Sequence, residues 1–184
     1  MITTYVCLLR GINVSGQKPI NMVALEKMFN DLGFFGVQTY IQSGNIVFGA
    51  DALTEPDPEQ SIAGGIQQTF GFEVPVIVVE KRELKDIVRN NPFANDPDKD
   101  STYFHLTLLS SLPENNPAER LIQKRSEGEE VACIGRSVYL YCPDGYGKTR
   151  LTNTFIEKVA GRSATTRNWR TMNELMRMAD AFKV

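Results

Sequence analysis

One order of segments occurs twice along this chain: a strand, a helix, a hairpin of two strands and a second helix. In the first half, a short apolar strand at 4–10 precedes an amphipathic helix at 22–32. In the second half, a strand at 103–109 precedes a helix at 117–127, and a hairpin then turns at Gly135. A chain that repeats this order is expected to form two similar halves.

The other expected segments follow the same order. In the first half they are two hairpin strands, a helix, a strand and a helix, at 37–41, 46–48, 59–70, 74–79 and 81–90. In the second half they are two hairpin strands and two helices, at 131–134, 138–142, 151–160 and 172–182. No strand is expected between the last two helices. A capping box at Thr171–Glu174 is expected to begin the last helix, and Trp169 to anchor the preceding loop to the core.

The order β-α-β-β-α-β is the ferredoxin-like pattern, in which right-handed crossovers place both helices on one face of the sheet. The sequence therefore predicts an α+β fold of duplicated ferredoxin-like halves, with mostly antiparallel sheets and an extra C-terminal helix. We assign the N-terminal half to residues 1–90, the connection to 91–101, and the C-terminal half with its terminal helix to 102–184. Tyr139 and Tyr141 are expected to pack against the other half rather than stack on bases, because the strands lack an RNA-recognition motif.

The residue types present limit the chemistry that the chain can perform. His105 is the only histidine and lies in a strand-like segment, which disfavours a zinc site or a histidine-based triad. Three cysteines without paired spacing indicate a reducing, cytoplasmic compartment. No signal peptide is expected in the first ten residues, and no apolar run is long enough for a membrane helix. We expect no metal and no cofactor.

Charge is unevenly distributed along the chain, although the net charge is only −2. Residues 50–132 contain 8 basic and 16 acidic residues, whereas residues 133–172 contain 7 basic and 2 acidic residues. The sequence pI of about 5.5 disfavours non-specific binding of duplex DNA, which depends on neutralising phosphates.

Several cations stand just before expected helices. Lys148 and Arg150 precede the helix at 151–160, Arg167 precedes the last helix, and Arg10 lies in the loop before the first. Cations are unfavourable at a helix N-terminus by about 0.3–1 kcal/mol each. Free N–H groups at the same place bind anions. The hypothesis is an anion-binding site; the alternative is that these cations are solvated or paired with carboxylates.

The segment Asp144–Thr149 has the context of a phosphate loop, between a strand and a helix. The Walker pattern requires a glycine five residues before Gly147, and Cys142 occupies that position, so the motif fails. A looser backbone nest around Gly145 and Gly147 can hold a phosphate or carboxylate. The alternative is a loop that uses glycine only for its turn geometry.

Four ordered motifs make the chain resemble a known family. They are Leu8–Val14, Tyr40–Asn45, Gly145–Gly147 with Leu151–Asn153, and Ala164–Thr171. With these motifs the chain resembles the bacterial domain-of-unknown-function family numbered sixteen ninety-seven. The resemblance spans nearly the whole chain and implies duplicated ferredoxin-like halves, but no established activity, substrate or cofactor. The family often has a second glycine at Ser15, and Ser-Lys in place of Thr149-Arg150.

The family motifs coincide with the basic junctions, which predicts one ligand-binding surface. Its expected residues are Arg10, Asn13, Ser43, Asn45, Lys148, Arg150, Arg167 and Asn168. The favoured function is binding of an anionic ligand, either a phosphorylated or carboxylated small molecule or a short single-stranded nucleic acid. One alternative is an enzyme that acts on a phosphorylated small molecule. The other is a structural or interaction protein whose motifs hold the two halves together. No membrane partner is expected, and the oligomeric state is left open.

Overall fold

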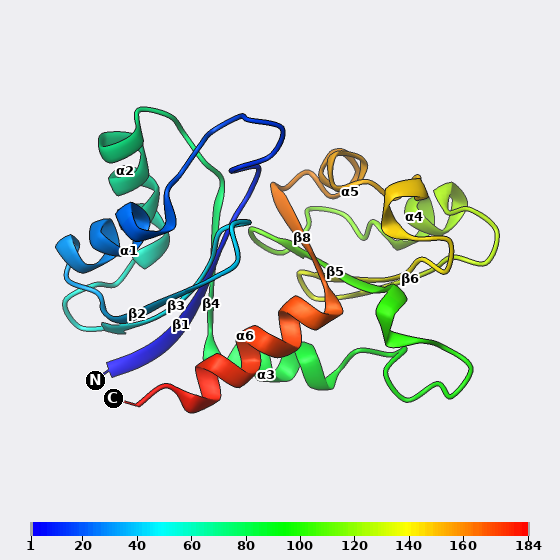
Figure 1. Ribbon diagram of the computed structural model, residues 1–184. Helices are drawn as coiled ribbons and strands as arrows, with labels where there is room; N and C mark the ends of the chain where they lie inside the picture. Colours follow the sequence, from blue (N-terminus) through cyan, green and yellow to red (C-terminus); the bar gives the residue numbers. More distant parts are fainter. Residues whose placement is uncertain (1, 184) are drawn as a thin grey trace. The chain divides into compact units, whose positions relative to one another are not determined.

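The computed structural model describes residues 2–183, and the chain forms two compact units (Figure 1). The first unit comprises the residues up to Asp86 together with those from Glu174 onward. The second unit comprises Ile87–Asn173. Each unit is described by itself below.

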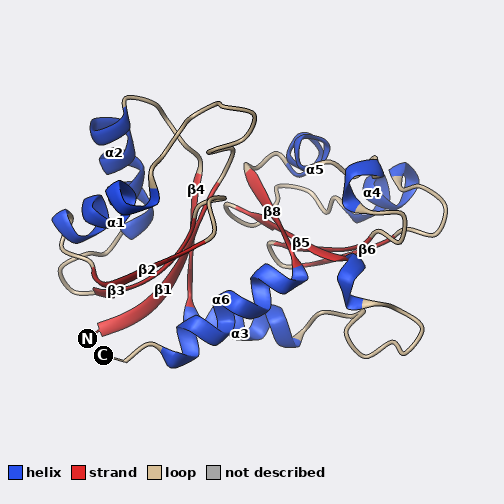
Figure 2. Ribbon diagram, in the orientation of Figure 1, coloured by secondary structure: helices blue, strands red, loops and turns tan. Residues whose placement is uncertain are grey.

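The first unit contains a four-stranded antiparallel sheet in the order β2-β3-β1-β4. Its elements are β1 (Ile2–Leu9), α1 (Met22–Asp31), β2 (Phe35–Tyr40), β3 (Asn45–Asp51), α2 (Pro58–Phe70) and β4 (Val76–Glu80), and the first part of α3 (Lys81–Arg89) follows. Both α1 and α2 cover one face of this sheet (Figure 2).

The second unit contains a sheet of the same order, β6-β7-β5-β8, also antiparallel. Its elements are η1 (Ser101–Tyr103), β5 (Phe104–Leu109), α4 (Ala118–Lys124), β6 (Glu130–Ile134), β7 (Ser137–Tyr141), η2 (Tyr146–Lys148), α5 (Asn153–Ala160), β8 (Ala164–Asn168) and the beginning of α6 (Trp169–Ala181). The predicted α+β fold of duplicated ferredoxin-like halves with an extra C-terminal helix is confirmed.

The strand registers show which positions of the two sheets correspond. Tyr5 of β1 is paired with Phe48 and Glu80. In the second sheet, His105 of β5 is paired with Leu140 and Asn168. Tyr5 therefore corresponds to His105, Phe48 to Leu140, and Glu80 to Asn168.

Each unit has its own hydrophobic core between the sheet and its two helices. In the first unit, Phe48 is fully buried and contacts the rings of Tyr5, Phe29 and Phe34. In the second unit, Leu140 occupies the corresponding place in a core of mostly aliphatic residues. Burial of one such side chain stabilises a fold by about 1.5–3 kcal/mol. Each core contains several of them and therefore holds in place the strand ends from which the loops leave.

The end of α6 packs on the first unit. The ring of Phe182 lies 6.4 Å from that of Phe35, and Lys81 forms a 3.1 Å ion pair with Asp180. A Cβ at Gly36 would lie 2.7 Å from the Phe182 ring, so glycine permits this close approach. The C-terminal helix therefore contributes to the first unit.

Two sequence-based expectations at the end of the chain are wrong. A strand is present where none was expected, because β8 (Ala164–Asn168) pairs with β5. Its residues lack apolar alternation, but the hydroxyl groups of Thr107 and Thr166 bond each other at 2.7 Å, which accommodates polar residues. The last helix also begins before the expected capping box: α6 starts at Trp169, and the Asn168 carboxamide accepts from the Thr171 N–H at 2.8 Å.

Tyr139 and Trp169 are both buried within the second unit, whereas packing of Tyr139 and Tyr141 against the other half stays a prediction. Tyr139 is 1% exposed, and its hydroxyl donates to the Ile87 carbonyl at 2.9 Å, so its ring cannot stack on a base. Trp169 is buried and lies edge-on to Phe104.

Among the described residues, no helix is both long and apolar enough to cross a membrane.

Candidate functional site

Asn13, predicted to bind a ligand, fastens the loop after β1. Its amide group donates to the carbonyls of Ile20 and Gln42 at 3.0 and 2.9 Å, and its carbonyl oxygen accepts from the Ile20 N–H. Asn13 adopts a φ of 54°, a conformation that asparagine tolerates better than most residues. The side chain of Asn13 therefore connects this loop to the turn between β2 and β3.

Asn45 fixes that turn from inside. The residue is fully buried, and its amide group donates to the Tyr40 carbonyl at 3.0 Å and to the Ser43 hydroxyl at 2.8 Å. Gly44 has a φ of 79°, and a Cβ there would lie 2.6 Å from that of Leu9. The motif Ser43-Gly44-Asn45 thus has a local structural role in the first unit.

Arg10 follows β1 directly and is half-buried. Its backbone N–H donates to the Pro75 carbonyl at 3.0 Å, which places Arg10 beside the segment that enters β4. Arg10, Asn13, Ser43 and Asn45 thus lie around one end of the first sheet.

The second group of predicted residues begins in the segment between β7 and α5, residues 142–152, here called the α5 loop. Lys148 and Arg150 are both exposed, and neither side chain forms an ion pair or hydrogen bond among the described residues. Thr149 between them is buried, and its hydroxyl accepts from the Leu151 N–H at 3.0 Å. The loop is therefore anchored at Thr149 while the two cations extend from it.

The α5 loop ends at a helix N-terminus that its own side chains only partly satisfy. The Thr152 hydroxyl accepts from the Phe155 N–H at 3.2 Å, and the first turn of α5 contains no acidic residue. The N–H groups of Asn153 and Thr154 have no acceptor within the described residues. Two backbone donors and two cations, with no negative partner among the described residues, thus lie within residues 148–154.

His105 supports the α5 loop from the central strand. Its ring stacks on that of Tyr146, with centroids 4.7 Å apart and planes inclined by 21°. The Nδ1 atom lies 3.3 Å from the Tyr103 carbonyl. Burial lowers the pKa of His105 below its usual value, and the contact with the Tyr103 carbonyl partly opposes that shift. This contact could not be predicted from the sequence, because 41 positions separate the two rings.

Asn168 and Arg167 diverge at the end of β8. Asn168 neighbours His105 in the sheet and uses its side-chain oxygen to cap α6. Successive strand residues point to opposite faces, so Arg167 points away from the face that carries His105. The Arg167 guanidinium donates to the Thr165 hydroxyl and the Thr166 carbonyl at 2.7 and 3.0 Å. Within the second unit, the α5 loop and Asn168 come together, and the Arg167 side chain lies on the other face.

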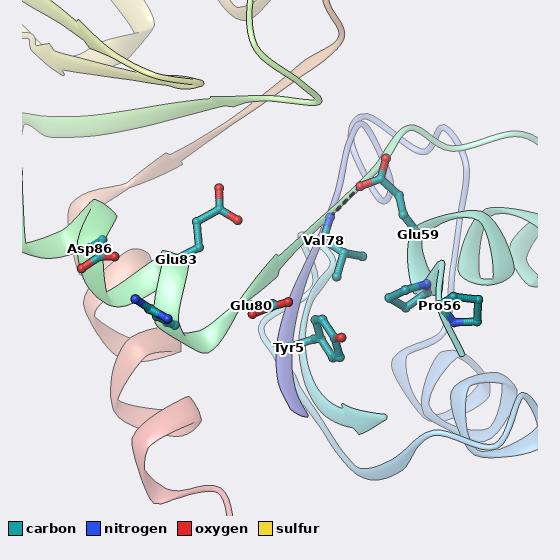
Figure 3. Close-up of a pocket in the computed structure, with 9 residues that line it drawn as sticks. Tyr5, Pro56, Glu59, Val78, Glu80, Glu83 and Asp86 are labelled. Atoms are coloured by element: carbon teal, nitrogen blue, oxygen red, sulfur yellow. Dashed lines mark hydrogen bonds between the residues drawn. The ribbon is translucent and has the colours of Figure 1, made fainter. Parts of the chain in front are cut away.

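A cleft in the first unit was not expected from the sequence. It has a volume of about 460 Å³ and lies between the start of α2, the edge strand β4 and α3 (Figure 3). Four of its nine lining residues are acidic: Glu59, Glu80, Glu83 and Asp86. Sequence reasoning missed the cleft because these carboxylates come from three separate elements.

The carboxylate of Glu59 in this cleft is already engaged. It accepts from the Val78 N–H at 3.0 Å, which satisfies a donor on the open side of β4 (Figure 3). Burial raises the pKa of the Tyr5 hydroxyl, and the neighbouring charge of Glu80 raises it further. This arrangement holds Glu59 in a structural role and keeps Tyr5 protonated.

The cysteines are poorly suited to nucleophilic chemistry. Cys7 and Cys142 are fully buried. Burial raises the pKa of the Cys133 thiol to about 11, and burial together with Glu129 raises that of Cys142 to about 11. A thiol rather than a thiolate therefore occupies both positions at neutral pH. Among the described residues, no cluster of His, Cys, Asp or Glu could hold a metal ion.

Comparisons with known proteins agree with this architecture. A conserved bacterial protein, SP0830 from Streptococcus pneumoniae, has a similar solved structure, with a TM-score of 0.69 and 21% sequence identity. The similarity covers 97% of this chain and 99% of that one, and at this identity it shows a common fold. No curated protein matches the sequence. Residues 2–139 match the family described as "Protein of unknown function (DUF1697)", and the chain belongs to that family.

Proposed function

We propose that the protein binds a small anionic ligand, bearing phosphate or carboxylate, at the α5 loop. One observation carries this proposal: Lys148 and Arg150 are exposed, have no partner among the described residues, and precede a helix N-terminus that has no acidic residue in its first turn. Positive side chains and the helix dipole repel each other there, and an anion would reverse the sign of both interactions.

The corresponding helix of the first unit is an internal control. Its N-terminus has acids of its own: Asp57 accepts from the Gln60 N–H at 3.0 Å, and Glu59 lies in the first turn. The helix α2 therefore needs no external anion. The contrast supports a ligand for α5, where the equivalent acids are missing.

The proposal uses only part of the surface predicted from the sequence. The side-chain amide groups of Asn13 and Asn45 donate hydrogen bonds within the first unit, which favours a structural role for those motifs. Lys148 and Arg150 are the proposed ligand-binding cations. A reducing cytoplasmic location is also proposed, supported by the odd number of cysteines and their lack of paired spacing.

Anion binding can be tested by titrating the protein with sulfate, inorganic phosphate and pyrophosphate while recording amide NMR shifts. The double variant Lys148→Gln/Arg150→Gln should bind at least about tenfold more weakly, because charge-assisted hydrogen bonds contribute about 1.5–3 kcal/mol each. A matched control, Arg120→Gln/Arg125→Gln, removes the same charge from α4 and its C-cap and should change affinity by less than about twofold. Equal losses in both variants would reject the α5 loop as the site.

The same titration separates a small anion from a nucleic acid. A short single strand offers several phosphates, so its affinity should fall steeply with added NaCl if several cations contact it. Two cations at one junction predict a shallow salt dependence and little gain over pyrophosphate. A much tighter and strongly salt-dependent single-strand complex would replace the small-molecule proposal.

A further inference from the structure

His105 is placed to sense an anion at the α5 loop. Its ring stacks face to face on Tyr146, which lies two residues before Lys148 in the same 3-10 turn. Its strand neighbour on the other side is Asn168, which caps α6 with its side chain. The imidazole is thus the supporting contact of the loop that carries the proposed cations.

We infer that His105 couples anion binding at the α5 loop to pH, so that protonation of the imidazole strengthens binding and a bound anion favours the protonated form. This inference rests on the proposed function and adds its regulation. Neither charge state disrupts the stack, because an imidazolium remains attractive to the face of a phenol ring. The change therefore acts through added positive charge.

The residues that the structure places directly against His105 carry no charge. Strand β7 presents Leu140 and strand β8 presents Asn168, neither of which titrates between pH 5 and 7.5. The residues just before β5 contribute the Tyr103 carbonyl, which contacts the Nδ1 atom of His105. The α5 loop contributes Tyr146, and its charged residues are Asp144, Lys148 and Arg150. None of the described carboxylates forms an ion pair with His105.

The expected size of the effect follows from Coulomb's law. At a separation on the order of 10 Å in water, one added charge changes the affinity for a dianion by about fourfold, and salt lowers this to about twofold. By linkage, a bound dianion must change the proton affinity of His105 by the same factor. Because burial lowers the pKa of His105, the strengthening should appear below the ordinary pKa of histidine.

The chain offers a clean measurement, since His105 is its only histidine. The imidazole proton resonance of the wild-type protein would be followed from pH 5 to 7.5, with and without saturating sodium sulfate, at constant ionic strength. Sulfate stays dianionic throughout this range. We expect the His105 pKa to rise in sulfate, and the sulfate Kd to fall by about two- to fourfold between pH 7.5 and 5.

Variants separate the two proposals. His105→Gln should lose the pH dependence of sulfate binding, whereas Tyr146→Phe, which keeps the ring stacked on His105, should retain it. If Lys148→Gln/Arg150→Gln abolishes sulfate binding but sulfate leaves the His105 pKa unchanged, this inference is wrong and the proposed function stands. If sulfate does not bind, or binds equally well to that double variant, both are wrong. The wild-type resonance decides the matter even if His105→Gln fails to fold.

Discussion

The two units carry opposite charges beside corresponding positions of their sheets. In the first unit, Tyr5 and Glu80 border a cleft with four carboxylates. In the second unit, His105 and Asn168 stand at the same register beside a loop that carries Lys148 and Arg150. The two sheets therefore share one strand order, but the charge of the side chains beside them is negative in the first unit and positive in the second.

The aromatic contacts differ in the same way. Tyr5 stacks inward on Phe48, with centroids 5.5 Å apart, and belongs to the hydrophobic core. In the second unit, Leu140 is the strand partner of His105 and corresponds to Phe48. The His105 ring stacks instead on Tyr146 of the α5 loop. Where the strand neighbour is aliphatic, the ring of the central strand contacts a loop instead of the core. The same sheet position thus belongs to the hydrophobic core in the first unit and contacts the candidate binding loop in the second.

The largest test of this comparison removes the two corresponding core side chains. Phe48→Ala should lower the free energy of unfolding by about 3–5 kcal/mol, and Leu140→Ala by about 2–5 kcal/mol, because each leaves a cavity in a closed core. Phe48 should cost more, since it also loses contacts with three rings. Urea unfolding gives the values, and hydrogen exchange shows which amides lose protection. A smaller loss for Phe48→Ala would contradict the proposed difference between the cores.

Sequence periodicity was sufficient to predict the helices, the hairpins and the duplication, because these depend on apolar spacing and turn residues. It missed β8, whose residues Ala164–Asn168 are mostly polar and are held by an edge pairing and a hydroxyl contact. It also missed the His105–Tyr146 stack, which depends on long-range packing. For the site, sequence could identify the unusual cations at a helix start. It could not show that the side-chain amide groups of Asn13 and Asn45 donate hydrogen bonds inside the first unit.

A second test concerns the backbone of the α5 loop, which has no equivalent in the first unit. Gly145 has φ 91° and ψ 144°, a region that essentially only glycine occupies, whereas Gly147 has no positive φ and open space around it. Gly145→Ala should cost about 1–3 kcal/mol. Gly147→Ala should change stability by less than about 1 kcal/mol. Thermal unfolding measures both, and equal effects would show that strain does not shape this loop.

The smallest test asks whether pH acts on one unit alone. Because burial lowers the pKa of His105, the unfolded chain binds more protons than the folded one just below the ordinary pKa of histidine. The free energy of unfolding should therefore fall as pH drops from 7.5 to 5.5, before the carboxylates titrate. His105→Gln should remove this slope, whereas Tyr5→Phe, at the corresponding position, should keep it because a tyrosine does not titrate there. Urea unfolding at the two pH values measures the slope, and an unchanged slope in His105→Gln would assign the sensitivity to a group other than His105.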